Sequence, residues 1–387
     1  MTPVPKRVTQ RDIARLAGVS QATVSLVLNN RADAEVRIAP ETRDRVLRAI
    51  QETGYVPDPV ARRLVSRFNR IIGVFTYEPA FPSGSRDFFH PFLVGIEEYA
   101  ERVGCDLLLF TSAPVTDGRR RVFHQDNRLR LADGCILLGR EIDADELSRL
   151  NRDGYPYVAV GRRDDADGPV RYVGADYAAA VRQLGEWAQR AGHRRLAYLG
   201  TGLTAESSAD RRRGFAEQAD SAERAFEVTG TGRSTDAMLD DLLAEGATVV
   251  FVEDFGTAVD VRAAALRRGL AVPGDLSILT LGDPTTPVPT DVTFTGFRIP
   301  REEMGRRAVE VLTAVVDGTA PDVPQRLLAC ELVDGTTLGQ PVPGGGGAPV
   351  TVRPIEPGAV RRTEPVAARP GRSGAARRTD LQSEGSK

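Results

Sequence analysis

The region from Ile71 to about residue 340 alternates short apolar runs with longer amphipathic stretches, which restricts the fold more than any other feature. Helix-like stretches such as PFLVGIEEYAERVG, ADELSRLNRDG and TAVDVRAAALRRG separate most of the runs. The runs, each expected to be a buried strand, are IIGVF, CDLLLF, CILLG, YVAVG, LAYLG, TVVFV and LSILTL. Alternating strands and helices predict parallel sheets covered on both faces. About 270 residues of this pattern suit two similar lobes.

Before this region, the segment VTQRDIARLAGVSQATVSLVLNN predicts two short helices with a turn between them. Thr9 and Asp12 approximate a capping box for the first helix. Gly18 can end that helix because glycine adopts the left-handed conformation at little steric cost. Ser20 is a good N-cap for the second helix. The expected apolar stripe of the first helix is Ile13, Leu16 and Ala17.

The second helix has two different faces at a helical spacing of 100° per residue. Its apolar face consists of Val24, Val27 and Leu28. Its opposite face consists of Gln21, Ala22, Ser25, Leu26 and Asn29. Two short helices with a glycine turn and a small, polar outer face are typical of the helix-turn-helix that enters a major groove. An ordinary pair of packed helices fits the spacing as well.

A third helix is expected from Pro40 to just before Gly54, with a weak cap at Ala39. After it, YVPDPVARRLVSRFNR can form a helix only over about residues 59–66, which is too short to be stable alone. This segment carries Arg62 and an exposed Leu64. It could fold on DNA with Leu64 wedged between base steps of a minor groove. Alternatively, it is a linker whose leucine packs on the next domain.

The segments DIARLAGVSQATVSLVLNN, PETRDRVLRAIQETGYVP and VARRL, in this order and spacing, closely resemble the lactose/galactose repressor (LacI/GalR) family of bacterial transcription regulators. The resemblance extends more loosely to about Gly339 as a periplasmic-binding-protein-like domain. It implies an α/β fold with an N-terminal all-α head. The implied parts are a helix-turn-helix DNA-binding domain (1–57), a hinge helix and linker (58–70), and a two-lobed effector-binding and dimerisation domain of parallel sheets (71–339).

The resemblance implies that the second helix reads the major groove and that a paired hinge helix inserts Leu64 into the central minor groove. Many members have Arg where this chain has Leu26, so contact with a thymine methyl replaces a bidentate guanine contact. Asp58 stands where Asn is usual. The full set of expected DNA-binding residues is Thr9, Ser20, Gln21, Ala22, Thr23, Ser25, Leu26, Asn29, Arg62 and Leu64.

Ligands of parallel α/β sheets bind beyond the carboxyl ends of the strands. The resemblance places Arg211 at an arginine that reaches ligand oxygens, and Asp254 at a ligand-contacting Asn or Asp. The next family acid falls on Gly282, with Asp283 one position later. The acidic residues would favour a sugar, whereas Arg211 could serve an acid or a phosphate. The expected effector-binding residues are Tyr77, Phe89, His90, Arg211, Asp254, Asp283 and Arg298.

The net charge of −2 conceals a basic head, because residues 1–70 carry a net charge of +6. A basic head is the electrostatic footprint of a phosphate-backbone binder. The first residues lack the apolar core of a signal peptide, and no apolar run is long enough for a membrane span, so we expect a cytoplasmic protein. The Pro/Gly/Arg-rich tail (340–387) is expected to be disordered.

Catalytic motifs are missing from the sequence. The three histidines occur without HExxH, GxSxG, Walker or dinucleotide-binding patterns, so no enzyme activity, cofactor or metal is expected. Three cysteines without CxxC spacing are expected to be buried, reduced thiols. The expected partners are a pseudo-palindromic double-stranded DNA operator, a small-molecule effector such as a sugar, and a second copy in a homodimer. A small-molecule sensor without specific DNA recognition is the alternative.

Overall fold

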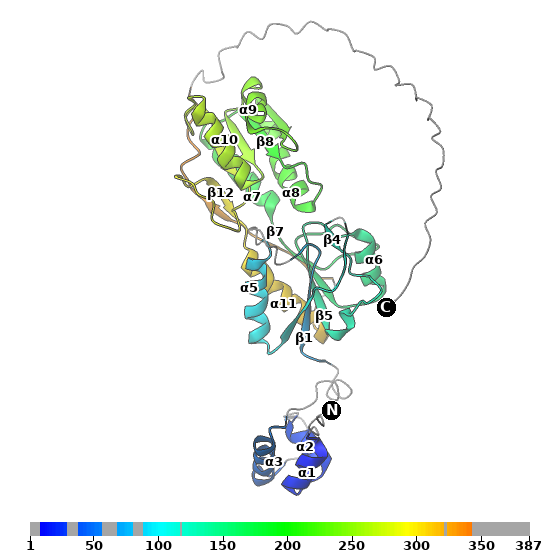
Figure 1. The fold of residues 1–387 in the computed structure, drawn as a ribbon. Helices are drawn as coiled ribbons and strands as arrows, with labels where there is room; N and C mark the ends of the chain where they lie inside the picture. Colours follow the sequence, from blue (N-terminus) through cyan, green and yellow to red (C-terminus); the bar gives the residue numbers. More distant parts are fainter. Residues whose placement is uncertain are drawn as a thin grey trace, which may run out of the picture. The chain divides into compact units, whose positions relative to one another are not determined.

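The structure is a computed structural model that describes residues 8–28, 38–55, 68–79, 88–116, 118–320 and 323–342. Two six-stranded sheets with flanking helices form two lobes, and three helices form a separate head cluster near the N-terminus (Figure 1). None of the helices within the described ranges is long and apolar enough to cross a membrane.

The head contains helices α1 (Gln10–Ala17), α2 (Gln21–Leu28) and α3 (Pro40–Thr53). The capping box at Thr9 forms in full, since its hydroxyl accepts from the Asp12 amide and the Asp12 carboxylate accepts from the Thr9 amide. Gly18 ends α1 with φ of 65°, so the predicted break between the two helices is confirmed. The third helix also has the predicted ends, with no side-chain cap at Ala39.

The head has its own small apolar core, in which Ile13, Val24 and Val46 are fully buried. One prediction for this core is wrong. The sequence predicts Leu16 in the apolar stripe of α1, but this residue is 62% exposed. Ala14 is buried instead, so the buried face of α1 consists of Ile13, Ala14 and Ala17.

The first lobe is built on a sheet whose paired strands are all parallel. In spatial order its strands are β13 (Gln325–Leu328), β7 (Tyr172–Ala175), β6 (Tyr157–Val160), β5 (Gly134–Leu138), β1 (Ile71–Thr76) and β2 (Asp106–Phe110). A small antiparallel hairpin, β3 (Val115–Thr116) and β4 (Arg119–Arg120), follows β2. A 3₁₀ turn (Leu129–Leu131) leads into β5.

The second lobe repeats this plan, with one antiparallel pair at the edge between β12 and β14. In spatial order its strands are β14 (Glu331–Val333), β12 (Thr295–Arg298), β11 (Ser277–Thr280), β10 (Val249–Val252), β8 (Arg195–Gly200) and β9 (Arg224–Thr229). The chain passes between the lobes three times, after β7, after β12 and between β13 and β14. Each lobe is therefore completed by a segment that is distant in sequence.

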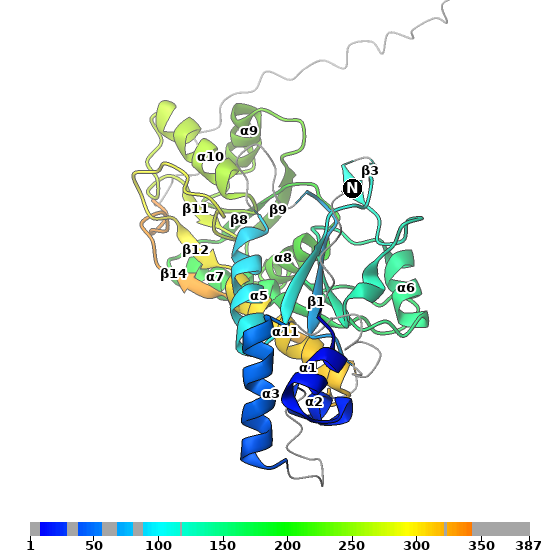
Figure 2. The same cartoon turned by 60° about the horizontal axis from the view of Figure 1, so that its bottom comes forward.

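Within the described residues, seven helices belong to the lobes. They are α5 (His90–Arg102), α6 (Ala144–Arg152), α7 (Tyr177–Arg190), α8 (Glu206–Ala216), α9 (Thr235–Ala244), α10 (Phe255–Arg267) and α11 (Arg301–Asp317). Helices α5 and α11 lie side by side in both views (Figure 1, Figure 2). They pack backbone against backbone, since a Cβ on Gly305 would lie 2.2 Å from the Phe92 carbonyl oxygen. This close packing fixes the first turns of both helices beside the interlobe space.

All seven predicted strands are present, and the prediction of two parallel-sheet lobes is confirmed. The expectation of full burial is wrong for β2, whose Asp106 and Leu107 are exposed. Among the strands that the structure describes, β2 pairs with β1 alone and forms the edge of its sheet, so one side of it meets solvent.

Candidate functional site

Two separate surfaces of this chain have the geometry of binding sites, and the first lies on α2 of the head. Gln21 and Ala22 are exposed, while Val24 and Val27 on the opposite face are buried. Ser25 and Leu26 are half-buried. The Arg11 Nε donates to Gln21 Oε1 at 3.4 Å, so α1 holds the Gln21 side chain from one side. The exposed part of α2 is small and polar, as a groove-reading helix requires.

The hydroxyl groups near the two helix starts act as caps. The Ser20 Oγ accepts from the Thr23 amide at 3.1 Å and lies 2.9 Å from the Thr23 hydroxyl. Thr9 caps α1 in the same way. Helix N-termini bind phosphate well because their free amides and dipole favour an anion. Three further predicted DNA-binding residues, Asn29, Arg62 and Leu64, lie outside the described residues.

The second surface is a cavity of about 300 Å³ between the two lobes. It is lined by residues that directly follow the carboxyl ends of β5, β6, β8, β10 and β11, together with the starts of α7 and α11. This is the edge at which open parallel sheets bind their ligands. The volume suits a small molecule.

One wall of the cavity is aromatic. Phe88, Phe89 and Phe92 line it from the first lobe, and the Phe88 and Phe89 rings meet edge to face with centroids 5.2 Å apart. The Arg140 guanidinium lies 4.8 Å from the centre of the Phe88 ring. Such a wall can cover the apolar face of a sugar or of a planar ring.

Arg211, on α8, lines the cavity from the second lobe. Its side chain is 7% exposed and lies over the Tyr177 ring, 3.9 Å from the ring centre. Its Nε donates to the Leu281 carbonyl at 2.7 Å, and its Nη1 donates to the Ser207 carbonyl at 3.0 Å. Burial raises the pKa of Tyr177, and the positive charges of Arg211 and Arg301 oppose this rise. Both guanidinium charges therefore lower the pKa of the same Tyr177 hydroxyl.

Three acidic residues line the cavity, and each one accepts hydrogen bonds from the protein. Glu253 accepts from the Tyr198 hydroxyl, the Thr201 amide and the Ser208 hydroxyl. Asp254 caps α10 by accepting from the Thr257 amide at 2.8 Å. Asp283 accepts from the Ile299 amide at 2.8 Å and from Arg301 Nη1 at 2.9 Å. These hydrogen bonds fix the three carboxylates within the cavity wall.

Comparison with known protein families agrees with this division into a head and two lobes. Residues 9–58 match the family model of bacterial regulatory proteins of the lacI family. Residues 80–239 match the periplasmic binding proteins and sugar binding domain of the LacI family, and residues 188–338 match a periplasmic binding protein-like domain. The chain belongs to the LacI family.

Relatives of this LacI-family chain cover most of its length. It is 29% identical to the HTH-type transcriptional regulator CelR of Thermobifida fusca over 84% of this chain and 96% of CelR. It is 28% identical to GalS of Salmonella typhimurium over 81% of this chain and 91% of GalS. The predicted resemblance is confirmed, and the chain is a ligand-responsive, DNA-binding transcriptional regulator.

Solved structures agree with the fold. The lac repressor dimer bound to operator and the anti-inducer ONPF aligns with a TM-score of 0.66 at 22% identity, over 86% of this chain and 100% of that chain. The CelR–cellobiose complex aligns with a TM-score of 0.56 at 25% identity, again over 86% and 100%. The predicted fold class, a helix-turn-helix head followed by a periplasmic-binding-protein-like domain, is therefore confirmed.

Of the seven effector residues predicted for this LacI-family chain, four line the cavity. They are Phe89, Arg211, Asp254 and Asp283. The structure places the other three elsewhere. Tyr77 continues the pairing of β1 through its amide, and its ring packs on Phe75 in the first lobe, 2% exposed. His90 begins α5 and is exposed outside the cavity. Arg298 points out of β12 to Glu331 at 3.1 Å.

Sequence reasoning missed Tyr177, Ser207 and Arg301 as cavity residues. Tyr177 and Arg301 each begin a helix directly after the chain passes between the lobes. The FRIPRE segment after a strand could have indicated Arg301, because a residue two or three places past a strand end reaches the ligand edge. Nothing in the sequence around Tyr177 indicated a crossing, since the tyrosine reads as a core residue of a helix.

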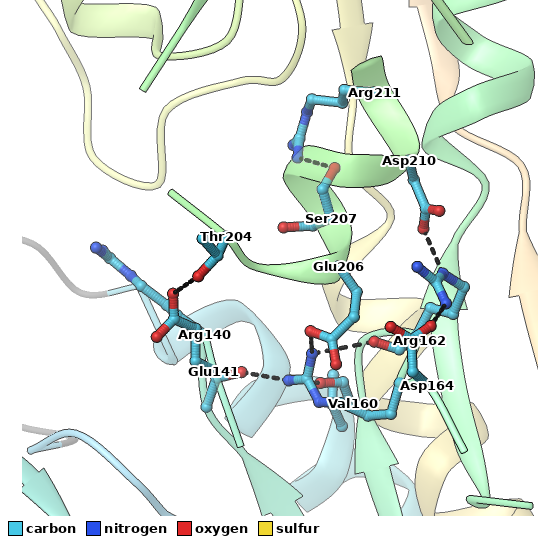
Figure 3. A network of polar contacts seen from close by, with 12 residues as sticks. Arg140, Glu141, Val160, Arg162, Asp164, Thr204, Glu206, Ser207, Asp210 and Arg211 are labelled. Atoms are coloured by element: carbon cyan, nitrogen blue, oxygen red, sulfur yellow. Dashed lines mark hydrogen bonds and ion pairs between the residues drawn. The ribbon is translucent and has the colours of Figure 1, made fainter. Parts of the chain in front are cut away.

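A network of ion pairs connects the two lobes of this LacI-family chain beside the cavity (Figure 3). Arg163 follows β6 and is 4% exposed. It donates to the Glu206 carboxylate of α8 at 3.0 Å and to the Gly139 carbonyl at 2.6 Å. Arg162 donates to Asp210, also on α8, at 2.7 Å. We call the pairs Arg163–Glu206 and Arg162–Asp210 the interlobe latch.

Two neighbouring faces of helix α8 contribute side chains to the latch and to the cavity. Asp210 points toward Arg162, while Arg211 extends away from it and donates to the Ser207 carbonyl (Figure 3). Glu206, four residues before Asp210, accepts from Arg163. Ser207 and Arg211, also four residues apart, line the cavity. Residues four apart share a helix face, so one face of α8 borders the cavity and the neighbouring face carries the latch carboxylates.

Other chemistry-bearing groups have structural roles. His193 is fully buried, with its ring nitrogens 2.9 Å from the Thr248 hydroxyl and 2.9 Å from the Gly339 carbonyl. Cys135 is buried, as predicted, but Cys105 and Cys330 are half-buried. Within the described ranges, no cluster of His, Cys, Asp and Glu could hold a metal ion.

Proposed function

We propose that this LacI-family regulator represses transcription by binding a pseudo-palindromic operator as a homodimer, and that a small molecule in the interlobe cavity changes its DNA affinity. One observation carries the proposal. A single chain combines a capped helix-turn-helix, whose second helix exposes Gln21 and Ala22, with a cavity lined by both lobes. Two-fold symmetry of a dimer would match two operator half-sites.

In this proposal, Gln21, Ala22, Ser25 and Leu26 contact base edges. Thr9, Ser20 and Thr23 lie at helix starts, where amides can bind phosphates. The assignments of Asn29, Arg62 and Leu64 rest on the sequence alone. A hinge leucine wedged into the minor groove would bend the DNA between the half-sites.

The proposed effector site consists of Phe89, Arg211, Asp254 and Asp283, to which the structure adds Tyr177, Ser207 and Arg301. CelR has been solved as a complex with cellobiose, and carbohydrates and their derivatives are therefore the first class to test. The effector changes DNA binding only if its affinity differs between the two arrangements of the lobes. That coupling is reciprocal, so operator DNA changes effector affinity by the same factor.

We further propose that the protein binds its effector without converting it, and that it acts in the cytoplasm, where its DNA target lies. In support, the described residues lining the cavity include no histidine or cysteine, and its three carboxylates are hydrogen-bonded to the protein. The alternative is a small-molecule binding protein without specific DNA recognition. The solvent-facing reading surface of α2 favours the regulator.

Selection of bound sequences from a random DNA pool by the full-length protein tests the proposal. We expect enrichment of one motif with two related half-sites in inverted order. The variant Gln21→Ala should relax the preference at one position of each half-site, while Arg298→Gln, far from the head in sequence, should leave the motif unchanged. A pool that remains random after repeated rounds would contradict specific DNA recognition.

A further inference from the structure

A second cavity of about 300 Å³ lies between the lobes, next to the interlobe latch. The Arg163–Glu206 pair borders both cavities, since Arg163 lines the first and Glu206 lines the second. The proposed effector site therefore does not account for the second space. Segments of both lobes form its wall, namely Tyr77, 119–121, 141–143 and Asp164 of the first lobe and 204–206 of the second.

The charges in the wall of the second cavity are almost fully paired. Each carboxylate that lines it forms an ion pair with an arginine. Arg120 also lines it, but forms no ion pair with any residue that the structure describes. The positive charge of Arg120 is therefore left without an opposite charge in the described wall. The four paired carboxylates belong to Arg119–Glu141, Arg121–Asp143, Arg162–Asp164 and Arg163–Glu206.

The Arg120 side chain is held in place by neutral oxygen atoms. Its Nη1 donates to the Thr76 hydroxyl at 2.9 Å and to the Glu78 carbonyl at 3.2 Å. The Glu78 carboxylate is engaged elsewhere, because it accepts from the Arg140 amide at 3.3 Å. These bonds fix the guanidinium of Arg120 beyond the carboxyl end of β1, at the ligand edge of the sheet. Its Nε is buried and has no hydrogen-bond partner among the described residues.

The Tyr77 hydroxyl is a second donor in this cavity without an acceptor. Tyr77 is 2% exposed and lines the cavity, and its hydroxyl forms no hydrogen bond with the described part of the chain. The Glu146 Oε2 atom is also buried without a hydrogen bond, so the Tyr77 hydroxyl does not donate to it. Burial and the nearby Glu146 charge raise the pKa of Tyr77. The hydroxyl therefore keeps its proton and can donate it to a hydrogen bond.

Two buried donors and an unbalanced positive charge together favour an anionic occupant. Buried polar groups normally have a partner in the protein, in water or in a ligand. A water molecule could accept from either donor, but it would leave the charge of Arg120 unbalanced. A carboxylate or phosphate oxygen accepts hydrogen bonds and supplies the opposite charge, and such charge-assisted hydrogen bonds are the stronger kind. The apolar residues of the wall are only Ile142 and Ala205 among those described, which suits a small polar compound.

We propose that the second cavity is a separate ligand site, in which the oxyanion of a small carboxylate or phosphate compound accepts from Arg120 and from the Tyr77 hydroxyl. Thr204 and Ala205 complete the wall from the second lobe, so the occupant contacts both lobes. Thr204 already donates to Glu141 of the first lobe at 3.4 Å (Figure 3). The site is independent of the compound that occupies the first cavity.

Isothermal titration calorimetry of the full-length protein tests the site with small probes. Inorganic phosphate and acetate represent the two oxyanions, and sodium chloride keeps the ionic strength constant. Acetamide has nearly the shape of acetate without its charge. We expect saturable binding of phosphate or acetate and none of acetamide. The tighter of the two anions identifies whether the site prefers a phosphate or a carboxylate.

Two variants assign the binding to this cavity. Tyr77→Phe removes only the hydroxyl, and should lower the anion affinity about fivefold through the lost hydrogen bond. Because that hydroxyl has no partner in the described protein, Tyr77→Phe should not lower the Tm of the ligand-free chain. Arg120→Gln should lower the affinity about tenfold or more. Arg182→Gln makes the same charge change on α7, outside both cavities, and should bind like the wild type.

The proposal is overturned if neither anion binds beyond chloride, or if acetamide binds as well as acetate. Unchanged affinity in Tyr77→Phe, or in a folded Arg120→Gln, would also overturn it, since the anion would then bind elsewhere on the chain. If Arg120→Gln does not unfold cooperatively, Tyr77→Phe decides alone. Selection of an operator motif does not involve this cavity, so the anion site and the regulator proposal can each fail separately.

Discussion

Arg163 Nη1 lies 3.0 Å from Glu206 Oε2, which joins the end of β6 in the first lobe to the first turn of α8 in the second. The Arg163 side chain is 3% exposed, and burial lowers the pKa of its guanidinium. The pair is therefore a largely buried ionic contact between the two lobes, beside the cavity. Separation of the lobes would leave a guanidinium without its carboxylate, so this contact opposes opening.

Replacing Arg163 should destabilise the joined lobes. We expect Arg163→Met to lower the free energy of unfolding by about 3 kcal/mol, because Glu206 loses its partner. Urea unfolding followed by circular dichroism measures the change. Arg182→Met is the matched control, since the Arg182–Glu217 pair is half-exposed and should contribute less than about 1 kcal/mol. Equal losses in the two variants would show that the interlobe pair contributes no more to the free energy of unfolding than the half-exposed pair does.

The head should lose discrimination when Gln21 loses its support. Arg11 donates to Gln21 Oε1 at 3.4 Å, so Arg11→Ala frees the Gln21 side chain to rotate. We expect Gln21→Ala to reduce the discrimination at one base pair by about 1–3 kcal/mol, and Arg11→Ala to reduce it partly. Competition between operator variants in fluorescence anisotropy measures this. Arg15→Gln removes a nearby exposed charge as a control and should leave the base preference unaltered.

The half-buried Leu26 should determine one letter of the operator. An apolar side chain contacts a thymine methyl, whereas arginine reads guanine through two hydrogen bonds. We expect Leu26→Arg to move the preference at one position of each half-site toward guanine. Repeating the DNA selection with this variant tests the change. An identical motif for both proteins would assign Leu26 to packing within the head.

The buried His193 should make stability depend on pH. Burial lowers the pKa of this imidazole below its usual value of 6.5, so the folded chain excludes a proton that the unfolded chain binds. Stability is therefore complete above about pH 6.5 and falls as the pH drops toward the lowered pKa. Urea unfolding at about pH 7.5 and about pH 5.5 should show a larger loss for the wild type than for His193→Gln. The exposed His90→Gln should behave like the wild type.

Local patterns sufficed for the helix ends of the head and for seven of the strands. The glycine break, the Ser20 cap and the Pro40 start depend on neighbouring residues, so the sequence predicted them correctly. Strands β13 and β14 pair with β7 and β12, which are far away in sequence. Nothing local in their short runs indicates those partners, and these two strands were not predicted. Strands β7, β9 and β12 were also not among the seven runs expected from the sequence.

The effector residues could likewise be predicted only in part from the sequence. Arg298 and Arg301 are three positions apart near the end of β12, but one points to Glu331 and the other lines the cavity. Tyr77 follows β1, yet its amide continues the strand pairing, which turns the ring into the core of the first lobe. The position after a strand end is readable from sequence, whereas the direction of each side chain depends on tertiary pairing.

The salt dependence of DNA binding tests the central claim most directly. Fluorescence anisotropy would compare the selected motif with a scrambled duplex of equal length and composition at about 50 and about 200 mM salt. We predict tighter binding to the motif at both concentrations, with an affinity loss of about a thousandfold or more across that range if 6–10 phosphates are contacted. Equal affinity for the motif and the scrambled duplex would contradict the account of this chain as a sequence-specific regulator.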